Sequence, residues 1–385
     1  MRIVVAPDKF KGSVSAEEAA AHIAAGIREA QPHAQVTVLP VADGGEGTLD
    51  AAVTAGYTRH DLTVTGPIGE PVAAAWARLD DTAVVEMSLA SGLAALPHDE
   101  NGDPILAARE ATSRGTGELI AAALDTTGCT RVILGVGGSA TTDGGAGMLA
   151  GLGARLLDAA GHEIPDGGAA LAQLATVDLS GLHPRVPEAQ FVLAADVDNP
   201  LTGERGATAV FGPQKGASQQ DVSELDAALV TFRDVLAETL GDSARDAAQA
   251  PGAGAAGGVG YAALAVLHAT RRPGIDVVLD LVNLDRAVTG ADLLITGEGS
   301  LDEQSLGGKT PVGVLRVGQA HGVPVIAVCG RTTLDRETLE ATGFRATHAL
   351  SDLAPDAHTS MREAPRLLRE VGHAVASELA STSNG

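Results

Sequence analysis

Lysines and carboxylates in glycine-rich segments are the residues of this sequence whose types and spacing can do chemistry. Only four of the 26 basic residues are lysines, and each lies within three residues of a glycine: Lys9, Lys11, Lys215 and Lys309. A lysine ammonium is a compact charge that can reach a phosphoryl group or a carboxylate. We therefore expect these lysines to bind an anionic substrate rather than to cover a helix surface.

Eight acidic residues occupy a comparable place, in polar loops that follow apolar segments: Asp8, Asp43, Glu46, Asp143, Asp196, Asp198, Glu298 and Asp302. Magnesium prefers oxygen ligands and is commonly held by one or two carboxylates together with substrate phosphates. A positioned carboxylate is also a suitable general base for a hydroxyl group. Any single one of these residues can instead be a helix cap or a turn former. Eight in the same type of loop favour phosphate chemistry.

The stretch Arg131–Met148 contains the longest of these loops. An apolar run, Val132–Leu134, is followed by six glycines with hydroxyl side chains and Asp143 between them. Such a strand-to-helix loop presents backbone N–H groups that can bind phosphate. Two alternatives remain open at this point. The segment Gly135–Ala140 fits the loose G-x-G-x-x-A dinucleotide pattern of an oxidoreductase, and a regulatory domain could sense a sugar acid without turning it over.

Composition limits the class of protein. The chain of 385 residues is 45% hydrophobic and carries a formal net charge of −23, which argues against nucleic acid or an anionic membrane as a partner. It has two cysteines, too few for a disulfide framework. No secretory signal or membrane span is predicted. We expect a cytoplasmic protein of two domains, and the sequence leaves open whether it forms a homodimer.

The order of the segments predicts an α/β fold. Arg2–Ala6, Gln35–Leu39, Phe191–Ala195 and Val323–Cys329 are expected as strands, each followed by a loop and a helix, which is typical of parallel sheets. Ser15 and Glu18 form a predicted capping box. Helices are also expected over Ile105–Leu124 and Val222–Leu240. Short alternating segments between residues 57 and 86 indicate antiparallel strands, and the composition break near Gly66 suggests a domain boundary.

Taken together, these loops resemble the first class of the bacterial glycerate kinase family, the glycerate 2-kinase-like proteins. The resemblance spans almost the whole chain in order. Its motifs are Ala6–Ser13, Pro40–Thr48, Gly115–Ile120, Gly137–Gly145, Asp196–Leu201, Phe211–Gly216 and Thr296–Asp302. Arg114 departs from the family pattern, in which an aromatic residue is expected at this place.

The resemblance implies two α/β domains with the active site in the cleft between them. Residues 1–66 and 287–385 would form a discontinuous, restriction-enzyme-like domain, and residues 67–286 an inserted, flavodoxin-like domain. It also implies that ATP, with Mg²⁺, phosphorylates a hydroxyl of D-glycerate to give 2-phosphoglycerate, or the 3-phosphate in some relatives.

Phosphoryl-transfer chemistry then assigns roles to the loop residues, because such catalysis consists largely of positioning and charge neutralisation. We expect Asp43 or Asp196 to hold Mg²⁺, Lys9 or Lys11 to neutralise the transferring group, and Asp8 or Asp196 to orient or deprotonate glycerate. Lys215 is the first candidate for the glycerate carboxylate. The remaining expected substrate- and phosphate-binding residues are Ser13, Gly44, Gly45, Gly137, Gly138, Ser139, Thr141, Asp143, Gly144, Glu298 and Lys309.

Overall fold

The computed structural model describes residues 1–383 and consists of two compact α/β units, which confirms the expected fold class. Unit 1 comprises Met1–Asp43, Asp50–Ala55 and the chain from Ile275 onward, and unit 2 comprises Gly44–Leu49 and Gly56–Gly274. The expected first domain runs to residue 385, and residues 384 and 385 lie outside the described part.

Unit 1 is built on a five-stranded, entirely parallel sheet. Its strands are β1 (Arg2–Pro7), β2 (Gln35–Val38), β11 (Leu293–Leu301), β12 (Val325–Thr332) and β13 (Ala346–Ala349), in the spatial order β13-β12-β11-β1-β2. Numbered along unit 1 alone, this order is 2-1-3-4-5. That is a doubly wound order, in which the chain leaves β1 toward one edge and returns at β11 toward the other. The inserted unit, expected to be flavodoxin-like, has a different, mixed sheet.

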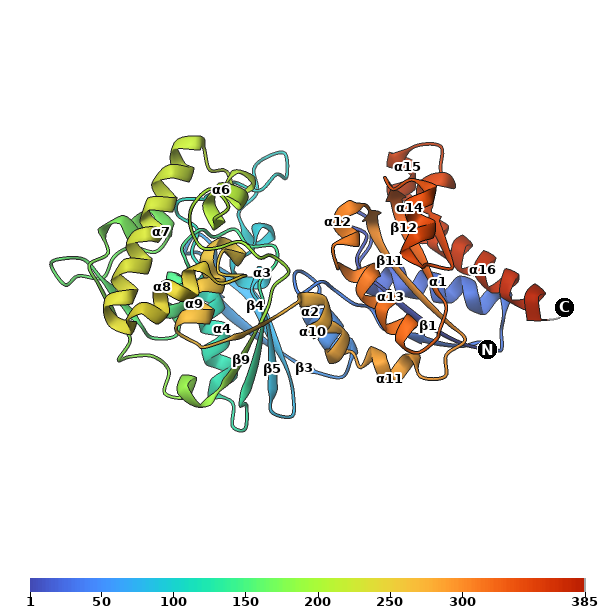
Figure 1. The fold of residues 1–385 in the computed structure, drawn as a ribbon, viewed down its shortest axis with the longest axis horizontal. Helices are drawn as coiled ribbons and strands as arrows, with labels where there is room; N and C mark the ends of the chain where they lie inside the picture. Colours follow the sequence, from blue (N-terminus) through green and yellow to red (C-terminus); the bar gives the residue numbers. More distant parts are fainter. Residues whose placement is uncertain (384–385) are drawn as a thin grey trace. The chain divides into compact units, whose positions relative to one another are not determined.

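Helices cover both faces of this sheet (Figure 1) because successive side chains of a strand point to opposite faces. Ile3 and Val5 pack in the core shared with α1 (Ala16–Ala30) and α16 (Ala364–Ser383). Val4 and Ala6 belong to the opposite core, which includes residues of α2 (Thr48–Thr54), α10 (Gly274–Leu281), α11 (Leu284–Val288) and α13 (Thr310–Ala320). The apolar run of β1 is thus explained by burial on both sides.

Helices α1 and α16 lie side by side on their face of the sheet. A Cβ atom added to Gly26 of α1 would lie 1.9 Å from the Arg369 carbonyl oxygen of α16, so the absence of a side chain permits this approach. The expected capping box at the start of α1 is confirmed: the Ser15 hydroxyl accepts from the Glu18 N–H, and the Glu18 carboxylate accepts from the Ser15 N–H.

Unit 2 contains a six-stranded mixed sheet in the order β10-β9-β6-β5-β4-β3. Strands β5 (Thr82–Glu86), β6 (Arg131–Gly135), β9 (Gln190–Ala194) and β10 (Thr270–Arg272) are parallel, whereas β3 (Thr58–Thr65) and β4 (Pro71–Leu79) are antiparallel. The break near Gly66 is a turn inside this sheet, where the Gly66 N–H donates to the Glu70 carbonyl oxygen. A two-stranded pair, β7 (Arg155–Leu157) and β8 (Thr176–Asp178), lies outside the main sheet.

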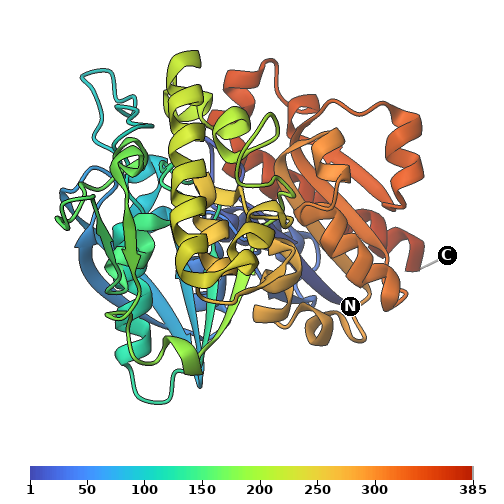
Figure 2. The ribbon, with the colours of Figure 1, turned by 60° about the vertical axis from the view of Figure 1, so that its left-hand side comes forward.

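The helices of unit 2 share one large apolar core with its sheet. The 22-residue helix α7 (Gln219–Leu240) runs along unit 2 in Figure 2. The other main helices are α4 (Arg114–Asp125), α5 (Ala146–Gly151), α8 (Asp242–Gln249) and α9 (Val259–Ala265).

The expected helix over Ile105–Leu124 is wrong in its first half, since α4 begins only at Arg114. The cause is Ser113, the residue before α4. Its N–H and its hydroxyl both donate to Asp143, so this N–H does not take part in a helix that extends further toward Ile105. Ile105 and Leu106 are also largely exposed, so the apolar spacing there does not reflect a buried helix face. Within residues 1–383, no helix has the length and apolar character required to cross a bilayer.

Candidate active site

Two carboxylates of unit 1 lie where β1 ends beside β11. Strand β11 continues to Leu301, so Glu298 lies within this strand and not in the loop that was expected to follow it. Pro7, the last residue of β1, pairs with Gly297 of β11, and Asp8 and Glu298 follow directly. The Asp8 N–H donates to the Gly297 carbonyl oxygen at 2.8 Å, which holds the two segments together. In doubly wound sheets, ligands bind beyond the carboxyl ends of the strands at the point where the strand order reverses. Here that point is between β1 and β11.

Two hydrogen bonds hold the Asp8 carboxylate in a fixed orientation, and its surroundings disfavour its negative charge. Its Oδ1 accepts from the Lys9 N–H at 2.6 Å and its Oδ2 from the Thr310 hydroxyl at 2.8 Å. Burial, with a further contribution from the Asp43 charge, raises the pKa of Asp8 to about 7, although both hydrogen bonds oppose the rise. Perturbed carboxylates of this kind are typical of functional sites.

Glu298 lies in the same electrostatic environment. Burial raises its pKa to about 7, the Asp8 charge adds to the rise, and Lys309 opposes it. Its Oε1 atom is buried and has no hydrogen-bond partner among the described residues. Two neighbouring carboxylates that resist ionisation indicate a place where a cation or a cationic complex would be stabilised.

The carboxylate oxygens of Asp8, Asp43 and Glu298 are of the type that Mg²⁺ prefers. Within residues 1–383, no three His, Cys, Asp or Glu side chains are grouped closely enough to hold a metal ion unaided. Magnesium in such sites commonly takes one or two carboxylates and completes its coordination with water and substrate phosphates. The residues present therefore fit Mg²⁺ delivered with a nucleotide.

A cavity of about 650 Å³ opens at these strand ends. It brings together, from unit 1, seven of the residues expected from the sequence: Asp8, Lys9, Lys11, Ser13, Asp43, Glu298 and Lys309. Lys9 and Lys11 come from the loop after β1, and Lys309 precedes the first residue of α13. Lysines and carboxylates thus face one volume, as binding of a phosphate–cation complex requires.

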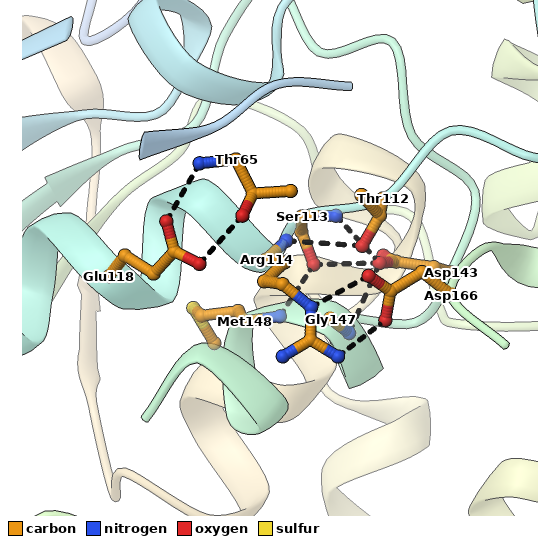
Figure 3. A network of polar contacts seen from close by, with 9 residues as sticks. All are labelled: Thr65, Thr112, Ser113, Arg114, Glu118, Asp143, Gly147, Met148 and Asp166. Atoms are coloured by element: carbon orange, nitrogen blue, oxygen red, sulfur yellow. Dashed lines mark hydrogen bonds and ion pairs between the residues drawn. The ribbon is translucent and has the colours of Figure 1, made fainter. Parts of the chain in front are cut away.

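In unit 2, Asp143 organises the loop after β6 (Figure 3). Its carboxylate is completely buried and accepts four hydrogen bonds: from the Ser113 N–H and hydroxyl at 2.8 Å, and from the N–H groups of Gly145 and Gly147 at 3.0 and 3.2 Å. Burial raises the pKa of Asp143, and these bonds oppose the rise. The N–H groups of Gly145 and Gly147 are therefore engaged within the protein. The Gly144 N–H likewise donates to the Gly257 carbonyl oxygen.

Figure 3 also explains two other sequence motifs. Arg114, the departure from the family pattern, forms a bidentate ion pair with Asp166 through bonds of 2.6 and 2.8 Å. Glu118 accepts from the N–H and the hydroxyl of Thr65, both at 2.7 Å, and so ties α4 to the end of β3.

Lys215 also supports the loop that follows β6. Its side chain is only 2% exposed, and its Nζ donates to the Ser139 hydroxyl at 2.8 Å and to the Thr141 carbonyl oxygen at 2.6 Å. Burial lowers its pKa to about 7, and the Asp143 charge opposes the fall. Its ammonium is thus engaged with Ser139 and Thr141, two residues that were themselves expected to bind substrate.

This buried lysine gives a testable pH dependence. Between about pH 7 and the ordinary value of 10.5, the unfolded chain binds a proton at Lys215 that the folded chain does not. The free energy of unfolding contributed by Lys215 therefore rises with pH in this window. We expect the melting temperature of the wild type, relative to Lys215→Met, to increase between about pH 7 and pH 9. A constant difference would contradict the burial, and Lys11→Met, at an exposed lysine, is the control.

The expected glycines of unit 2 allow loops to approach closely. A Cβ atom on Gly137 would lie 2.5 Å from the Gly45 Cα atom, and one on Gly44 would lie 2.7 Å from the Gly274 Cα atom. Gly138 has a φ of +72° and is exposed. The loop of residues 44–49 is anchored by Glu86 at the end of β5, which accepts from the N–H groups of Gly47 and Leu49. Glu86 was not among the predicted site residues, although the strand that it ends was predicted.

Asp196 follows β9 and is exposed, and its Oδ1 accepts from the Gly274 N–H at 2.7 Å. The adjacent strand β10 ends at Arg272, which sequence reasoning also missed. The two consecutive arginines before Pro273 were the available signal in the sequence. The first of them, Arg271, forms an ion pair with Asp198 at 2.7 Å. Strand ends of unit 2 thus carry a carboxylate and a cation on neighbouring strands.

The geometry of unit 1 is that of an enzyme of the phosphate-transferring class, with lysines and acidic groups around a cavity at the strand switch. The chain belongs to the glycerate kinase family, whose model matches residues 3–380. It is 49% identical to the glycerate kinase of Bacillus subtilis strain 168 over 349 residues, covering 90% of this chain and 89% of that protein.

The chain is 47% identical to the glycerate 2-kinase of Escherichia coli K12 over 350 residues, with 90% and 89% of the two chains covered. A crystal structure from Salmonella typhimurium LT2, provisionally named glycerate kinase 2, is similar over the full length of both chains, with a TM-score of 0.84 and 40% identity. This family membership agrees with the resemblance recognised from the loop motifs and not with the dinucleotide pattern.

Proposed function

We propose that this chain is an ATP-dependent glycerate kinase that transfers the γ-phosphoryl group of ATP to D-glycerate. The observation that carries the proposal is the family match over residues 3–380. The name of the Escherichia coli relative, glycerate 2-kinase, supports 2-phosphoglycerate as the product. The cavity of unit 1 supplies the charges that this chemistry needs.

The roles follow from charge and position. Phosphoryl transfer spreads negative charge over the oxygens of the transferred group, and nearby cations stabilise it. Lys9 and Lys11 line the cavity beside Asp8 and are suited to this task. Asp8, whose pKa is raised to about 7 by burial and by Asp43, is suited to accept the proton of the glycerate hydroxyl. Lys309 and Ser13 complete the polar part of the cavity.

We assign Asp43 as the carboxylate that holds Mg²⁺, with Glu298 in support. Asp43 and Glu298 line the same cavity, and the buried Glu298 Oε1, which has no hydrogen-bond partner in the described part of the chain, offers a further oxygen. When bound, Mg²⁺ neutralises phosphate charge and orients the nucleotide. Asp196, the other expected ligand, belongs to unit 2, where its Oδ1 accepts from the Gly274 N–H, and its role stays a prediction.

We propose that the loop after β6 is held in a fixed conformation by buried residues. Asp143 and Lys215 hold its backbone, which leaves Gly138 exposed and the amides of Gly144 and Gly145 engaged within the protein.

Both cysteines, Cys129 and Cys329, are free and buried, and free thiols are typical of a reducing compartment. The proposal therefore places the enzyme in the cytoplasm. Sedimentation velocity measures whether it forms a homodimer.

The proposal is tested by ADP release from ATP in the presence of Mg²⁺ and D-glycerate. We expect turnover that depends on D-glycerate and is abolished by chelation of Mg²⁺. Lys11→Ala should lower kcat/KM at least about 100-fold, since it removes a cation from a developing charge. The control is Arg336→Ala, which removes an exposed cation of unit 1 that pairs with Glu340. Absence of glycerate-dependent turnover in the wild type would refute the proposed function.

A further inference from the structure

The cavity of unit 1 has two chemically different halves. One half carries the lysines and carboxylates described above. The other is mainly apolar: it is lined by Phe10, Leu350, Ala354, Pro355, Met361 and Ala364, with the polar residues Ser351, Asp356 and Ser360 among them. The catalytic roles do not account for this apolar half, and apart from Phe10 its residues lie outside the family motifs. A cavity of about 650 Å³ lies within the usual range for small-molecule sites, roughly 300–1,000 Å³.

Apart from Phe10, the apolar half is formed by the segment that follows β13. This segment contains a 3₁₀ turn (Leu350–Asp352), α15 (Ala357–Arg362) and the first residue of α16. Phe10 and Leu350 are 3% and 1% exposed and form a fixed floor, whereas Met361 is 48% exposed at the rim. Methionine adapts to flat aromatic ligands because its side chain is unbranched and polarisable.

A hydrogen bond connects this apolar segment to the lysine-bearing loop. The Ser13 hydroxyl donates to the Met361 carbonyl oxygen at 2.5 Å. Ser13 belongs to the loop that also carries Lys9 and Lys11, so the charged and apolar halves are fixed relative to each other within unit 1. A ligand that fills both halves must combine an anionic end with a flat apolar end at a defined separation.

Of the two substrates of the proposed reaction, only one has this character. Glycerate is small and polar throughout, so it gains nothing from an apolar wall. ATP joins a flat purine to a polyanion. We propose that this cavity is the nucleotide site, with the purine of ATP against the apolar half and its phosphates against Lys9, Lys11 and Lys309. The inference rests on the proposed function and adds which unit binds ATP and through which residues.

The glycine-rich loop of unit 2 is the competing phosphate site. Its Gly144 and Gly145 amides donate to the Gly257 carbonyl oxygen and to Asp143, so these two groups do not face a ligand. In unit 1 the cavity lies instead at the β1/β11 strand switch, the usual position of a nucleotide in a doubly wound sheet. The two sites predict different effects of the same substitutions.

The first test is calorimetric titration of the full chain with ADP in the presence of Mg²⁺. Met361→Glu places a carboxylate at the apolar rim and should raise the Kd for ADP at least about 10-fold, because a charge disfavours contact with the purine. The matched control is Leu353→Glu, since Leu353 is 49% exposed on the same segment but does not line the cavity. Binding of tripolyphosphate, which has no purine, should change little in either variant. Equal ADP affinities for the two variants would overturn the inference.

The second test is photolabelling of the wild type with 8-azido-ATP, followed by mapping of the labelled peptide. We expect the label within residues 350–364 and protection by ATP. A label on the loop at residues 137–145, in an enzyme that phosphorylates glycerate, would overturn the nucleotide site while leaving the proposed function intact. A protein that neither binds ADP nor phosphorylates glycerate would overturn both.

Discussion

Asp8→Asn is expected to lower kcat for D-glycerate by about 10²- to 10⁴-fold, the range typical of a lost general base. The substitution removes the carboxylate charge that lies between β1 and β11 but keeps the size of the side chain. Its oxygen can still accept from the Lys9 N–H, and its amide can donate to the Thr310 hydroxyl. Steady-state turnover measures the effect.

The fold should survive this change. Burial and the neighbouring Asp43 disfavour the charge of Asp8, so its removal should leave the melting temperature at or above that of the wild type. Asp292→Asn is the control, because Asp292 is an exposed carboxylate of unit 1 that accepts from the Arg2 N–H and pairs with the Met1 amino group. An Asp8→Asn variant with kcat near that of the wild type would remove Asp8 from the proposed mechanism.

Asp143→Asn is expected to lower the free energy of unfolding by about 1–3 kcal/mol, because an amide cannot accept all the hydrogen bonds of a buried carboxylate. One side of the new side chain would direct N–H groups at the donors Ser113, Gly145 or Gly147. We also expect reduced turnover, since the loop that contains Ser139 would lose its internal anchor. Urea unfolding at neutral pH measures the first effect.

Asp166→Asn is the matched control for this prediction. Asp166 lies in the same region and forms a bidentate ion pair with Arg114, but both side chains remain about one-third exposed. Partly exposed pairs of this kind contribute less than about 1 kcal/mol. If Asp143→Asn were no less stable than Asp166→Asn, the four hydrogen bonds would not have the anchoring role given to them.

Much of the fold was accessible from local patterns. The apolar runs of β1, β6 and β9 predicted strands because strands buried on both faces need continuous apolar sequence. The capping box at Ser15 predicted the start of α1 because its two hydrogen bonds are made within four residues. Asp8, Lys9, Asp43 and Glu298 were expected in loops that the family resemblance assigns to one domain, and they line one cavity of unit 1.

Features that depend on distant partners were not accessible. The helix before Leu124 begins at Arg114 because Ser113 binds Asp143, thirty residues away in the chain. Lys215 was expected in a substrate contact, and no local pattern signals that it is buried against Ser139 and Thr141. Except for Phe10, the apolar half of the cavity comes from residues 350–364, whose sequence contains no motif, and only the fold brings it to the same cavity as the lysines.

Phosphorus NMR of the purified protein incubated with Mg²⁺, ATP and D-glycerate tests the central claim most directly, because it identifies the product together with turnover. The account predicts a new phosphomonoester signal that coincides with added 2-phosphoglycerate, with ADP formed in equal amount. A signal that coincides with 3-phosphoglycerate would contradict the proposed regiochemistry. Hydrolysis of ATP to inorganic phosphate, with no new ester, would contradict glycerate as the acceptor.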